Sequence, residues 1–201
     1  MLRRGGAALI ALTLAGLAGC GSSRPIQYYD VQVPAPPDVT RNTYPVRLLV
    51  ARLNAPMILR DNRIVYRTGA NEVGTYEYHR WAEPPALMVE VNLLHLLRES
   101  GKYQSVAELG SSARGDFVVR GRLRDFEEVD TETIAGRVSM EIELYEQKTG
   151  QTVWSHFYSH DEPARGGDIA AVVEALDRSL RSSLAEVTAG LEQYFAKNPP
   201  R

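Results

Sequence analysis

Three features of this sequence carry residue types that could do chemistry. His156 and His160 have the spacing of a helical metal-binding pair, and residues 127–132 contain four carboxylates. Carboxylates in such clusters serve as general acids and bases or as calcium ligands. The third feature is Cys20, the only cysteine among 201 residues. A single cysteine excludes an intramolecular disulfide and every paired-cysteine metal or redox motif.

Neither the two histidines nor the acidic cluster is predicted to form a site. Residues 152–160 have the aromatic and β-branched content of a strand, which would place the two imidazoles roughly 13 Å apart, too far for one metal ion. The acidic cluster lacks the carboxylate spacing of a calcium loop, so we interpret it as a solvated loop between two strands. The motifs of serine hydrolases, zinc proteases and nucleotide-binding loops do not occur. The sequence thus predicts no catalytic residue, no metal ligand, no cofactor and no enzymatic activity.

The chain begins with the features of a secretion signal. Arg3 and Arg4 precede an uncharged, mostly apolar run over residues 7–18, which is too short to span a bilayer. The run ends in Leu17-Ala18-Gly19-Cys20. This ending resembles the bacterial lipobox, whose cysteine becomes the lipidated first residue of the mature protein. We therefore expect a signal peptide over 1–19 and acyl chains, such as palmitate, on Cys20.

The residue after Cys20 bears on the destination of the protein. It is Gly21, whereas an aspartate at this position in bacterial lipoproteins commonly marks retention at the inner membrane. The resemblance therefore implies an outer-membrane lipoprotein that faces the periplasm. Several acyl chains would make this anchoring effectively permanent.

Composition and length place the rest of the chain in one globular domain. Hydrophobic residues make up 44% and charged residues 24%, as in ordinary globular proteins. The net charge of −2 argues against nucleic acid as a partner. We expect a lipidated tether over 20–25, a single domain over 26–196 and a C-terminal tail over 197–201.

Alternating apolar residues predict strands in both halves of this domain. The clearest alternation lies in 136–145, where Val138, Met140, Ile142 and Leu144 point to one face. Further strands are expected at 26–33, 45–52, 75–81, 116–126 and 152–160. Residues 58–66 read as a tight hairpin around Asp61-Asn62.

Two helices separate and follow the strands. The first is expected at about 84–100, with Leu87, Val91, Leu94 and Leu97 on its apolar face. The second is expected at 168–196, with Asp168 as its N-cap, an apolar stripe from Ile169 to Phe195, and Gly190 as a weak point. The order of elements predicts an α+β fold, with a mainly antiparallel or mixed sheet, both helices on one face and a polar opposite face.

Aromatic and cationic residues crowd the segment 66–81. The tyrosines Tyr76 and Tyr78 alternate with polar residues and, with Arg80, should share one strand face, while Trp81 lies on the other. Such a cluster is either one side of the core or an interface, where tyrosine, tryptophan and arginine are enriched. Because Trp81 directly precedes the first helix, we expect it to be buried. Tyr76, Tyr78 and Arg80 are then the candidate partner-binding residues.

The same segment carries a family resemblance. A tyrosine-rich strand leads to Trp81 and Pro84-Pro85, and the helix that follows ends at Ser100-Gly101 before Tyr103. This pattern, together with residues 116–126, resembles the ABC-type transport auxiliary lipoproteins, which include the paraquat-inducible lipoprotein C type. The resemblance covers roughly residues 26–190, and none of its motifs is catalytic. The stretch 110–115 is longer than the family pattern.

The resemblance implies a non-catalytic role in transport. Members of this family accompany ABC permease complexes whose partners carry MCE domains, and they act at the outer membrane in moving lipids or other hydrophobic molecules. Two alternatives stay open at this point: a structural lipoprotein of an envelope assembly or secretion machine, and a periplasmic hydrolase. The identity of the transported molecule and the oligomeric state, monomer or homo-oligomer, are also open.

Overall fold

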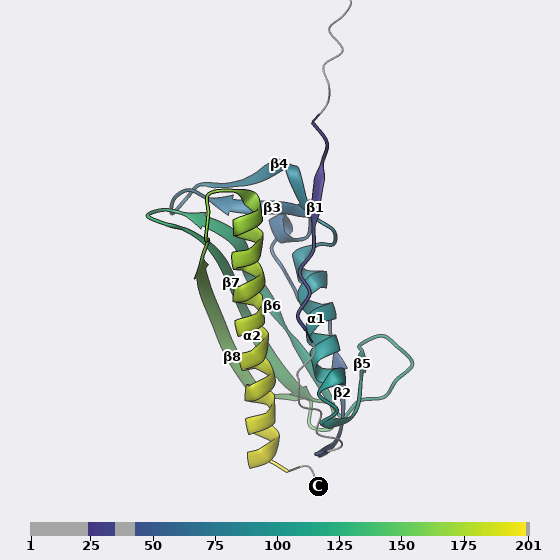
Figure 1. The fold of residues 1–201 in the computed structure, drawn as a ribbon. Helices are drawn as coiled ribbons and strands as arrows, with labels where there is room; N and C mark the ends of the chain where they lie inside the picture. The colour runs from purple at the N-terminus through teal and green to yellow at the C-terminus, as the bar shows by residue number, and fades with distance from the viewer. Residues whose placement is uncertain (1–23, 35–42, 200–201) are drawn as a thin grey trace, which may run out of the picture.

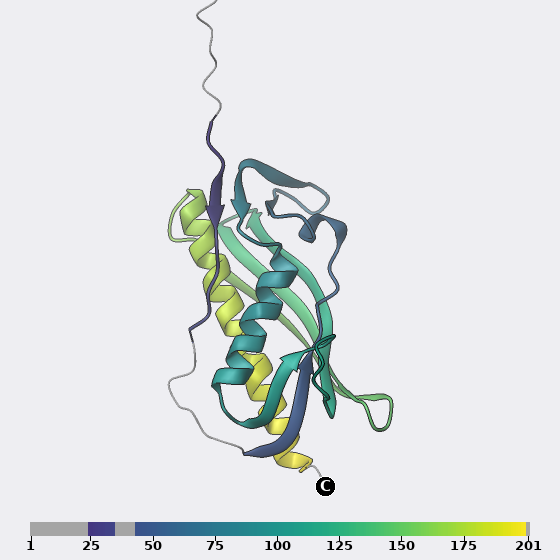
Figure 2. The same cartoon turned by 90° about the vertical axis from the view of Figure 1, so that its right-hand side faces the viewer.

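A computed structural model describes residues 24–34 and 43–199 of the chain (Figure 1). Cys20 and the predicted signal peptide lie outside these ranges. The described residues form one mixed sheet of eight strands with two helices, which confirms the predicted α+β class. Both helices lie on the same face of the sheet (Figures 1 and 2). Neither helix combines the length and apolar character that a membrane span requires.

The elements follow the predicted order. The strands are β1 (Gln27–Tyr29), β2 (Tyr44–Val50), β3 (Arg63–Arg67), β4 (Val73–Trp81), β5 (Tyr103–Glu108), β6 (Phe117–Asp130), β7 (Ile134–Glu146) and β8 (Gln151–Pro163). The helices are α1 (Pro85–Glu99) and α2 (Ile169–Lys197), with a 3-10 turn, η1 (Met57–Leu59), before β3.

The long strand β6 organises the sheet. One edge of β6 pairs antiparallel with β7 over its whole length, and β7 pairs antiparallel with β8. The other edge of β6 is shared by two shorter strands, which both run parallel to it: β2 beside Phe117–Val119 and β3 beside Glu127–Val129. Strand β5 extends the sheet beyond β2, while β4 and β1 extend it beyond β3. Parallel and antiparallel pairs therefore meet at β6.

The predicted periodicities of β7 and α2 are confirmed. Val138, Met140, Ile142 and Leu144 are all fully buried under α2. The α2 stripe from Val172 to Phe195 is buried as well, and the side chain of Asp168 accepts a hydrogen bond from the Ala171 N–H at 2.9 Å, as an N-cap does. Gly190 is no weak point, because a Cβ there would lie 2.7 Å from the Trp154 ring; the missing side chain lets α2 approach β8 closely.

Several local predictions are wrong. Residues 57–59 form the turn η1 instead of a strand, and the hairpin partner of β3 is β4. On α1, Val91 is exposed, because the buried face of this helix runs through Met88, Val89, Leu93 and Leu97. Helix α1 leans on β5 and β2 and also touches α2, so its core face is turned from the predicted stripe.

The first strand is also shorter than predicted. Strand β1 pairs with β4 only over Gln27–Tyr29, and the chain then continues as an extended segment along α1. The side chain of Asn92, itself buried, donates to the Val31 carbonyl at 3.0 Å and accepts from the Val33 N–H at 2.7 Å. Because these hydrogen bonds stand in for a sheet partner, Val31 and Val33 can be buried without one.

Candidate functional site

Trp81 ends β4 inside the core. Its side chain is fully buried and meets the ring of Phe126 edge-on, with the ring centroids 5.2 Å apart. The prediction that Trp81 belongs to the buried set is therefore confirmed. This side chain fixes the end of β4 against β6 and so sets the position of the tyrosines before it.

The alternation predicted for β4 fails in its middle. Arg63 on β3 faces Arg80, yet Val65 faces Thr75. Two steps along β3 therefore correspond to five steps along β4, where regular pairing would give two. Such an irregularity bends the strand and re-aims its side chains. The ring of Tyr76 therefore meets that of His79, which regular alternation would place on the opposite face with Trp81, at a centroid distance of 5.8 Å. His79 in turn lies within hydrogen-bonding distance, 3.0 Å, of the Tyr29 hydroxyl on β1.

Tyr76 is tied into the structure through Glu128. Its hydroxyl donates a hydrogen bond of 2.7 Å to the carboxylate of Glu128, which is only 5% exposed. Burial, followed by this hydrogen bond to a carboxylate, raises the pKa of the Tyr76 hydroxyl. The Tyr66 ring packs edge-on against Tyr76 at 5.1 Å. Tyr76 therefore has a supporting role in the fold that the sequence did not reveal.

Replacing Tyr76 with phenylalanine should lower stability without removing the ring. Among the described side chains, Tyr76 is the one hydrogen-bond donor to Glu128, so the substitution leaves a buried carboxylate without it. We expect a loss of about 1–3 kcal/mol in the free energy of unfolding, measured in urea. Tyr28→Phe, at an exposed tyrosine of β1, is the control and should stay near wild type. A Tyr76→Phe protein as stable as wild type would contradict this role.

Tyr78 and Arg80 are less enclosed than Trp81, and both are partly exposed. The guanidinium of Arg24 lies 5.6 Å from the centre of the Tyr78 ring, within the range of a cation–π contact. The Nε atom of Arg80 is buried and has no hydrogen-bond partner among the described residues. Of the three candidate partner-binding residues, these two have side chains that are not committed to a buried carboxylate.

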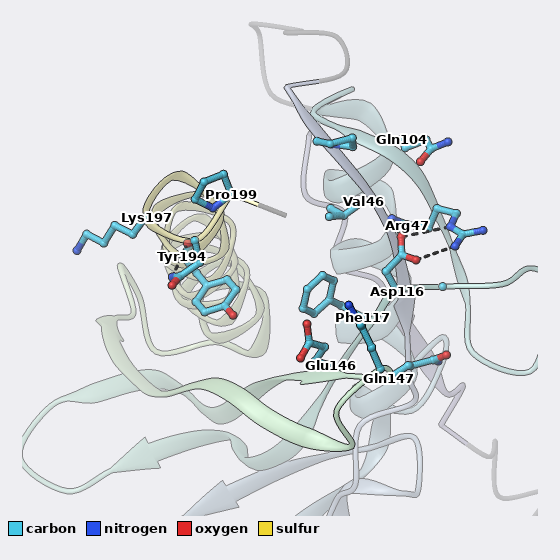
Figure 3. Close-up of a pocket in the computed structure, with 14 residues that line it drawn as sticks. Val46, Arg47, Gln104, Asp116, Phe117, Glu146, Gln147, Tyr194, Lys197 and Pro199 are labelled. Atoms are coloured by element: carbon cyan, nitrogen blue, oxygen red, sulfur yellow. Dashed lines mark hydrogen bonds and ion pairs between the residues drawn. The ribbon is translucent and has the colours of Figure 1, made fainter. Parts of the chain in front are cut away.

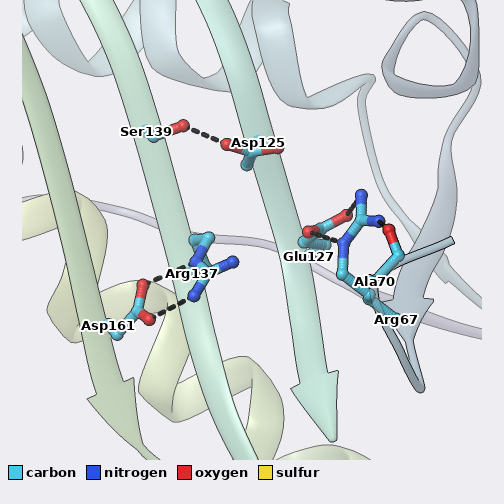
Figure 4. A network of polar contacts seen from close by, with 7 residues as sticks. All are labelled: Arg67, Ala70, Asp125, Glu127, Arg137, Ser139 and Asp161. Carbon is cyan, nitrogen blue, oxygen red and sulfur yellow. Dashed lines mark hydrogen bonds and ion pairs between the residues drawn. The ribbon is translucent and has the colours of Figure 1, made fainter. Parts of the chain in front are cut away.

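The acidic cluster is only in part the solvated loop that we expected: Asp130 and Glu132 are exposed, but Glu127 and Glu128 are buried on β6. Strand β6 continues to Asp130, and Glu127 is only 4% exposed. The guanidinium of Arg67 holds it with two hydrogen bonds, of 2.6 and 3.2 Å (Figure 4). Arg67 belongs to β3, the parallel neighbour of this part of β6. An arginine sixty residues away therefore compensates the buried charge, which the local sequence could not indicate.

The same network continues across the sheet. Arg137 of β7 donates two hydrogen bonds, of 2.8 and 2.6 Å, to Asp161 of β8, and Ser139 of β7 donates one to Asp125 of β6 (Figure 4). The hydrogen bond from Arg137 holds the pKa of Asp161 below its usual range. The described residues contain no group of three or more histidine, cysteine, aspartate or glutamate side chains placed to hold a metal ion. His156 and His160 both lie on β8, as predicted.

An open hollow of about 970 Å³ lies between the C-terminal end of α2 and the first residues of β2 and β6 (Figure 3). Phe117 and Tyr194 line it together with polar side chains. At its rim Arg47 donates to Asp116 through its Nη2 at 2.7 Å and its Nε at 3.2 Å, and its backbone N–H adds a third bond of 2.8 Å. The sequence analysis missed this pair. The sequence shows only that Arg47 and Asp116 carry opposite charges near the starts of two strands. That the two residues are neighbours follows from the parallel pairing of β2 with β6.

The pair at the hollow makes stability depend on pH. The hydrogen bond from Arg47 lowers the pKa of Asp116. A carboxyl whose pKa is lower in the folded than in the unfolded state stabilises the fold above its unfolded pKa of about 3.9, and this contribution is lost as the pH falls through the folded value. Asp116→Asn should therefore be less stable than wild type at pH 7.

Unfolding in urea between pH 7 and pH 3 measures this effect. The difference between wild type and Asp116→Asn should narrow as the pH falls below about 5. Glu132→Gln removes an exposed carboxylate that forms no ion pair within the described residues, so it serves as the control and should follow the wild-type curve. A difference that stays constant over this pH range would contradict the ion-pair explanation.

Comparison with known proteins identifies the family to which the chain belongs. The sequence matches the ABC-type transport auxiliary lipoprotein components over residues 29–188. A search of curated proteins finds no match.

Two solved structures share the fold. A crystal structure of a DUF330-family protein from Xanthomonas campestris is 24% identical, with a TM-score of 0.77, covering 86% of this chain and 97% of that one. The crystal structure of an uncharacterized protein is 16% identical, with a TM-score of 0.65, covering 84% of this chain and 99% of that one. The family match runs from Tyr29, the last residue of β1, to Thr188 within α2, and so covers all the elements between them. The chain belongs to the family of ABC-type transport auxiliary lipoprotein components.

Proposed function

We propose that this protein is anchored through acylated Cys20 to the periplasmic face of the outer membrane. There it serves as a non-enzymatic component of an ABC transport system that includes an MCE-domain protein. This system moves lipids or other hydrophobic molecules between membranes. The family match over residues 29–188 is the observation that carries the proposal. The leader that ends at Cys20, followed by Gly21, supports the anchor and its destination.

The described side chains support a role based on contacts. The buried carboxylate of Glu127, the part-buried one of Asp116 and the exposed one of Asp161 are each held by an arginine. A carboxylate held in this way is a poor general base, because the guanidinium favours its ionised form and occupies its oxygens. We therefore assign to this domain a role in binding other components of the transport system.

Tyr78 and Arg80 are the residues through which we propose contact with the MCE-domain protein. Both are partly exposed, and tyrosine and arginine are among the residue types enriched where proteins recognise one another. The hydroxyl of Tyr76, the third candidate, is hydrogen-bonded to Glu128. A substitution of Tyr76 would therefore disturb the fold as well as any contact with the partner.

Co-purification tests the proposed function. The full-length lipoprotein, extracted from membranes, should capture an MCE-domain protein and an ABC permease. Tyr78→Ala and Arg80→Ala should weaken this capture while leaving the circular dichroism spectrum unchanged. Phe157→Ala, which truncates an exposed aromatic residue on β8, is the matched control. Recovery of envelope-assembly or secretion components in place of the transporter would overturn the proposal.

The anchor has its own test. Mass spectrometry of the mature N-terminal peptide should show diacylglyceryl and acyl groups on Cys20. A Cys20→Ser protein should leave the membrane fraction, since acyl chains contribute about 0.8 kcal/mol per buried CH₂. A Cys20→Ser protein that stays in the membrane would show that the chain is held there by something else.

A further inference from the structure

Four large apolar side chains are exposed at the end of the molecule where the described chain begins. Ile26 is 41% exposed, Tyr28 59%, Met57 80% and Ile58 38%. We call these four residues the entry-end patch. A single exposed apolar residue is ordinary, but several at one end of a domain indicate a surface that contacts something apolar.

The topology brings the patch together from two distant parts of the sequence. Tyr28 on β1 lies opposite Arg80 on β4, and Arg80 lies opposite Arg63 on β3. Because neighbouring strands are about 4.8 Å apart, the Cα atoms of Tyr28 and Arg63 are separated by about 10 Å. The turn η1 packs against β3, and both views show it at the same end as β1 (Figures 1 and 2).

The turn η1 divides its side chains between the core and the surface. Leu59 is 2% exposed and packs into the core, whereas Met57 and Ile58 remain outside it. Leu59 is therefore enough to attach the turn to the domain. Folding alone does not account for the apolar character of Met57 and Ile58.

Only a short stretch of chain joins the predicted anchor to this end. Ile26 is the sixth residue after Cys20, and a fully extended chain spans at most about 3.6 Å per residue. An acylated Cys20 would thus keep Ile26 within about 22 Å of the bilayer surface. This step rests on the acylation in our proposed function.

The opposite end of the domain lies well away from the patch. Leu109 donates its N–H to the carbonyl of Val50, which lies beside Val119 on β6. Val65 of β3, the strand that borders the patch, lies beside Glu127 of β6, so Arg63 at the start of β3 is level with Asp125. The six residues from Val119 to Asp125 correspond to about 20 Å.

The groups around the patch match the chemistry of a membrane surface. Arg24, Arg60 and Arg63 bring guanidinium groups to this end, and such groups pair with lipid phosphates. Tyrosine side chains are enriched at the boundary between the apolar and polar layers of a membrane, which is the position that Tyr28 would occupy. Asp61 lies 3.6 Å from Arg63, so the local charge is mixed and apolar insertion is the main attraction.

We propose that the entry-end patch inserts into the surface of the bilayer that holds Cys20. The domain then stands on the membrane, with the hollow beside Arg47 and Asp116 at its far end. Tyr78 and Arg80 lie beside the patch, so a partner bound to them approaches along the bilayer. The occupant of the patch is membrane lipid, and a protein partner or a second copy of this chain would be a different outcome.

Polarity-sensitive labels on the lipidated full-length protein test this proposal. Acylation occupies the sulfur of Cys20, so an introduced cysteine is the single free thiol. Met57→Cys would carry a bimane label in vesicles of phosphatidylethanolamine and phosphatidylglycerol, without any partner protein. Leu109→Cys and Phe157→Cys are matched controls, since both residues are apolar and about half exposed but lie away from the patch.

The label at Met57→Cys should shift its emission to the blue in vesicles. A nitroxide near the lipid headgroups should quench it at least about twofold more than the labels at the two control positions, because interfacial side chains sit within this layer. Equal quenching at all three positions, or none at Met57→Cys, would overturn the inference. A blue shift that persists without lipid and depends on protein concentration would identify a second copy as the occupant, and would also overturn it.

The same preparation separates the two proposals. Protein that enters vesicles but shows an unquenched label at Met57→Cys refutes the entry-end patch and leaves the anchor intact. Protein with an unmodified Cys20 that fails to enter vesicles refutes the anchor, and the inference that rests on it fails with it.

Discussion

Trp81→Ala should destabilise the protein by about 3 kcal/mol or more, since truncation of a buried tryptophan typically costs about 3–5 kcal/mol. Trp81 is fully buried against Phe126, so its removal opens a cavity between β4 and β6. The Nε1–H of Trp81 is buried without an acceptor among the described residues, and its removal relieves that cost. We therefore expect a value near the lower end of the range.

Urea or thermal unfolding measures this effect, with Phe157→Ala as the control. Phe157 is also aromatic and lies in a strand, but it is 52% exposed, so its truncation should change stability by no more than about 1 kcal/mol. If the two substitutions had equal effects, Trp81 would not be the core residue that joins β4 to β6. A selective loss for Trp81→Ala would support the division of β4 between core and surface.

Leu180→Ala should cost about 2–5 kcal/mol. Leu180 is fully buried in the middle of α2, in the core between this helix and the sheet. A typical domain has a total stability of only about 5–15 kcal/mol, so this single change should lower the melting temperature clearly. Leu184→Ala, one turn later and equally buried, should behave in the same way.

The neighbouring residue Arg181 is the control for this pair. Its guanidinium pairs with Asp177 at 2.8 Å and donates to the Gln32 carbonyl at 3.2 Å, both at exposed positions. Exposed pairs of this kind contribute about 1 kcal/mol or less, so Arg181→Ala should have a small effect. Similar losses from all three substitutions would mean that α2 does not bury its predicted stripe on the sheet.

Elements with a strong internal period could be predicted well from the sequence. Strand β7 and helix α2 each bury one complete side of a regular pattern, so the spacing of their apolar residues reports the face that becomes core. On α1 the same method placed Val91 in the core, where it is not. This helix has apolar residues on most of its surface, so its orientation depends on the elements that it touches.

Polar groups were harder to predict than apolar stripes. The acidic residues of 127–132 looked solvated because they crowd a short stretch between two predicted strands. The burial of Glu127 and Glu128 depends on Arg67 and Tyr76, which β3 and β4 bring from more than fifty residues away. Tyr76 itself looked like a free surface residue for the same reason.

The sequence by itself determined the α+β class, the family and the buried stripes of β7 and α2, and it predicts the lipid anchor. Each of these inferences rests on a local pattern or a short motif, and such patterns can be interpreted without knowing which distant residues become neighbours in the fold. Only the tertiary structure decided that Glu127 and Glu128 are buried, that β4 is irregular between Thr75 and Arg80, and that Ile26 and Tyr28 share one end with Met57. The free energy of a charged or apolar group depends on the partners that surround it, and in this fold those partners come from strands that the chain order keeps apart.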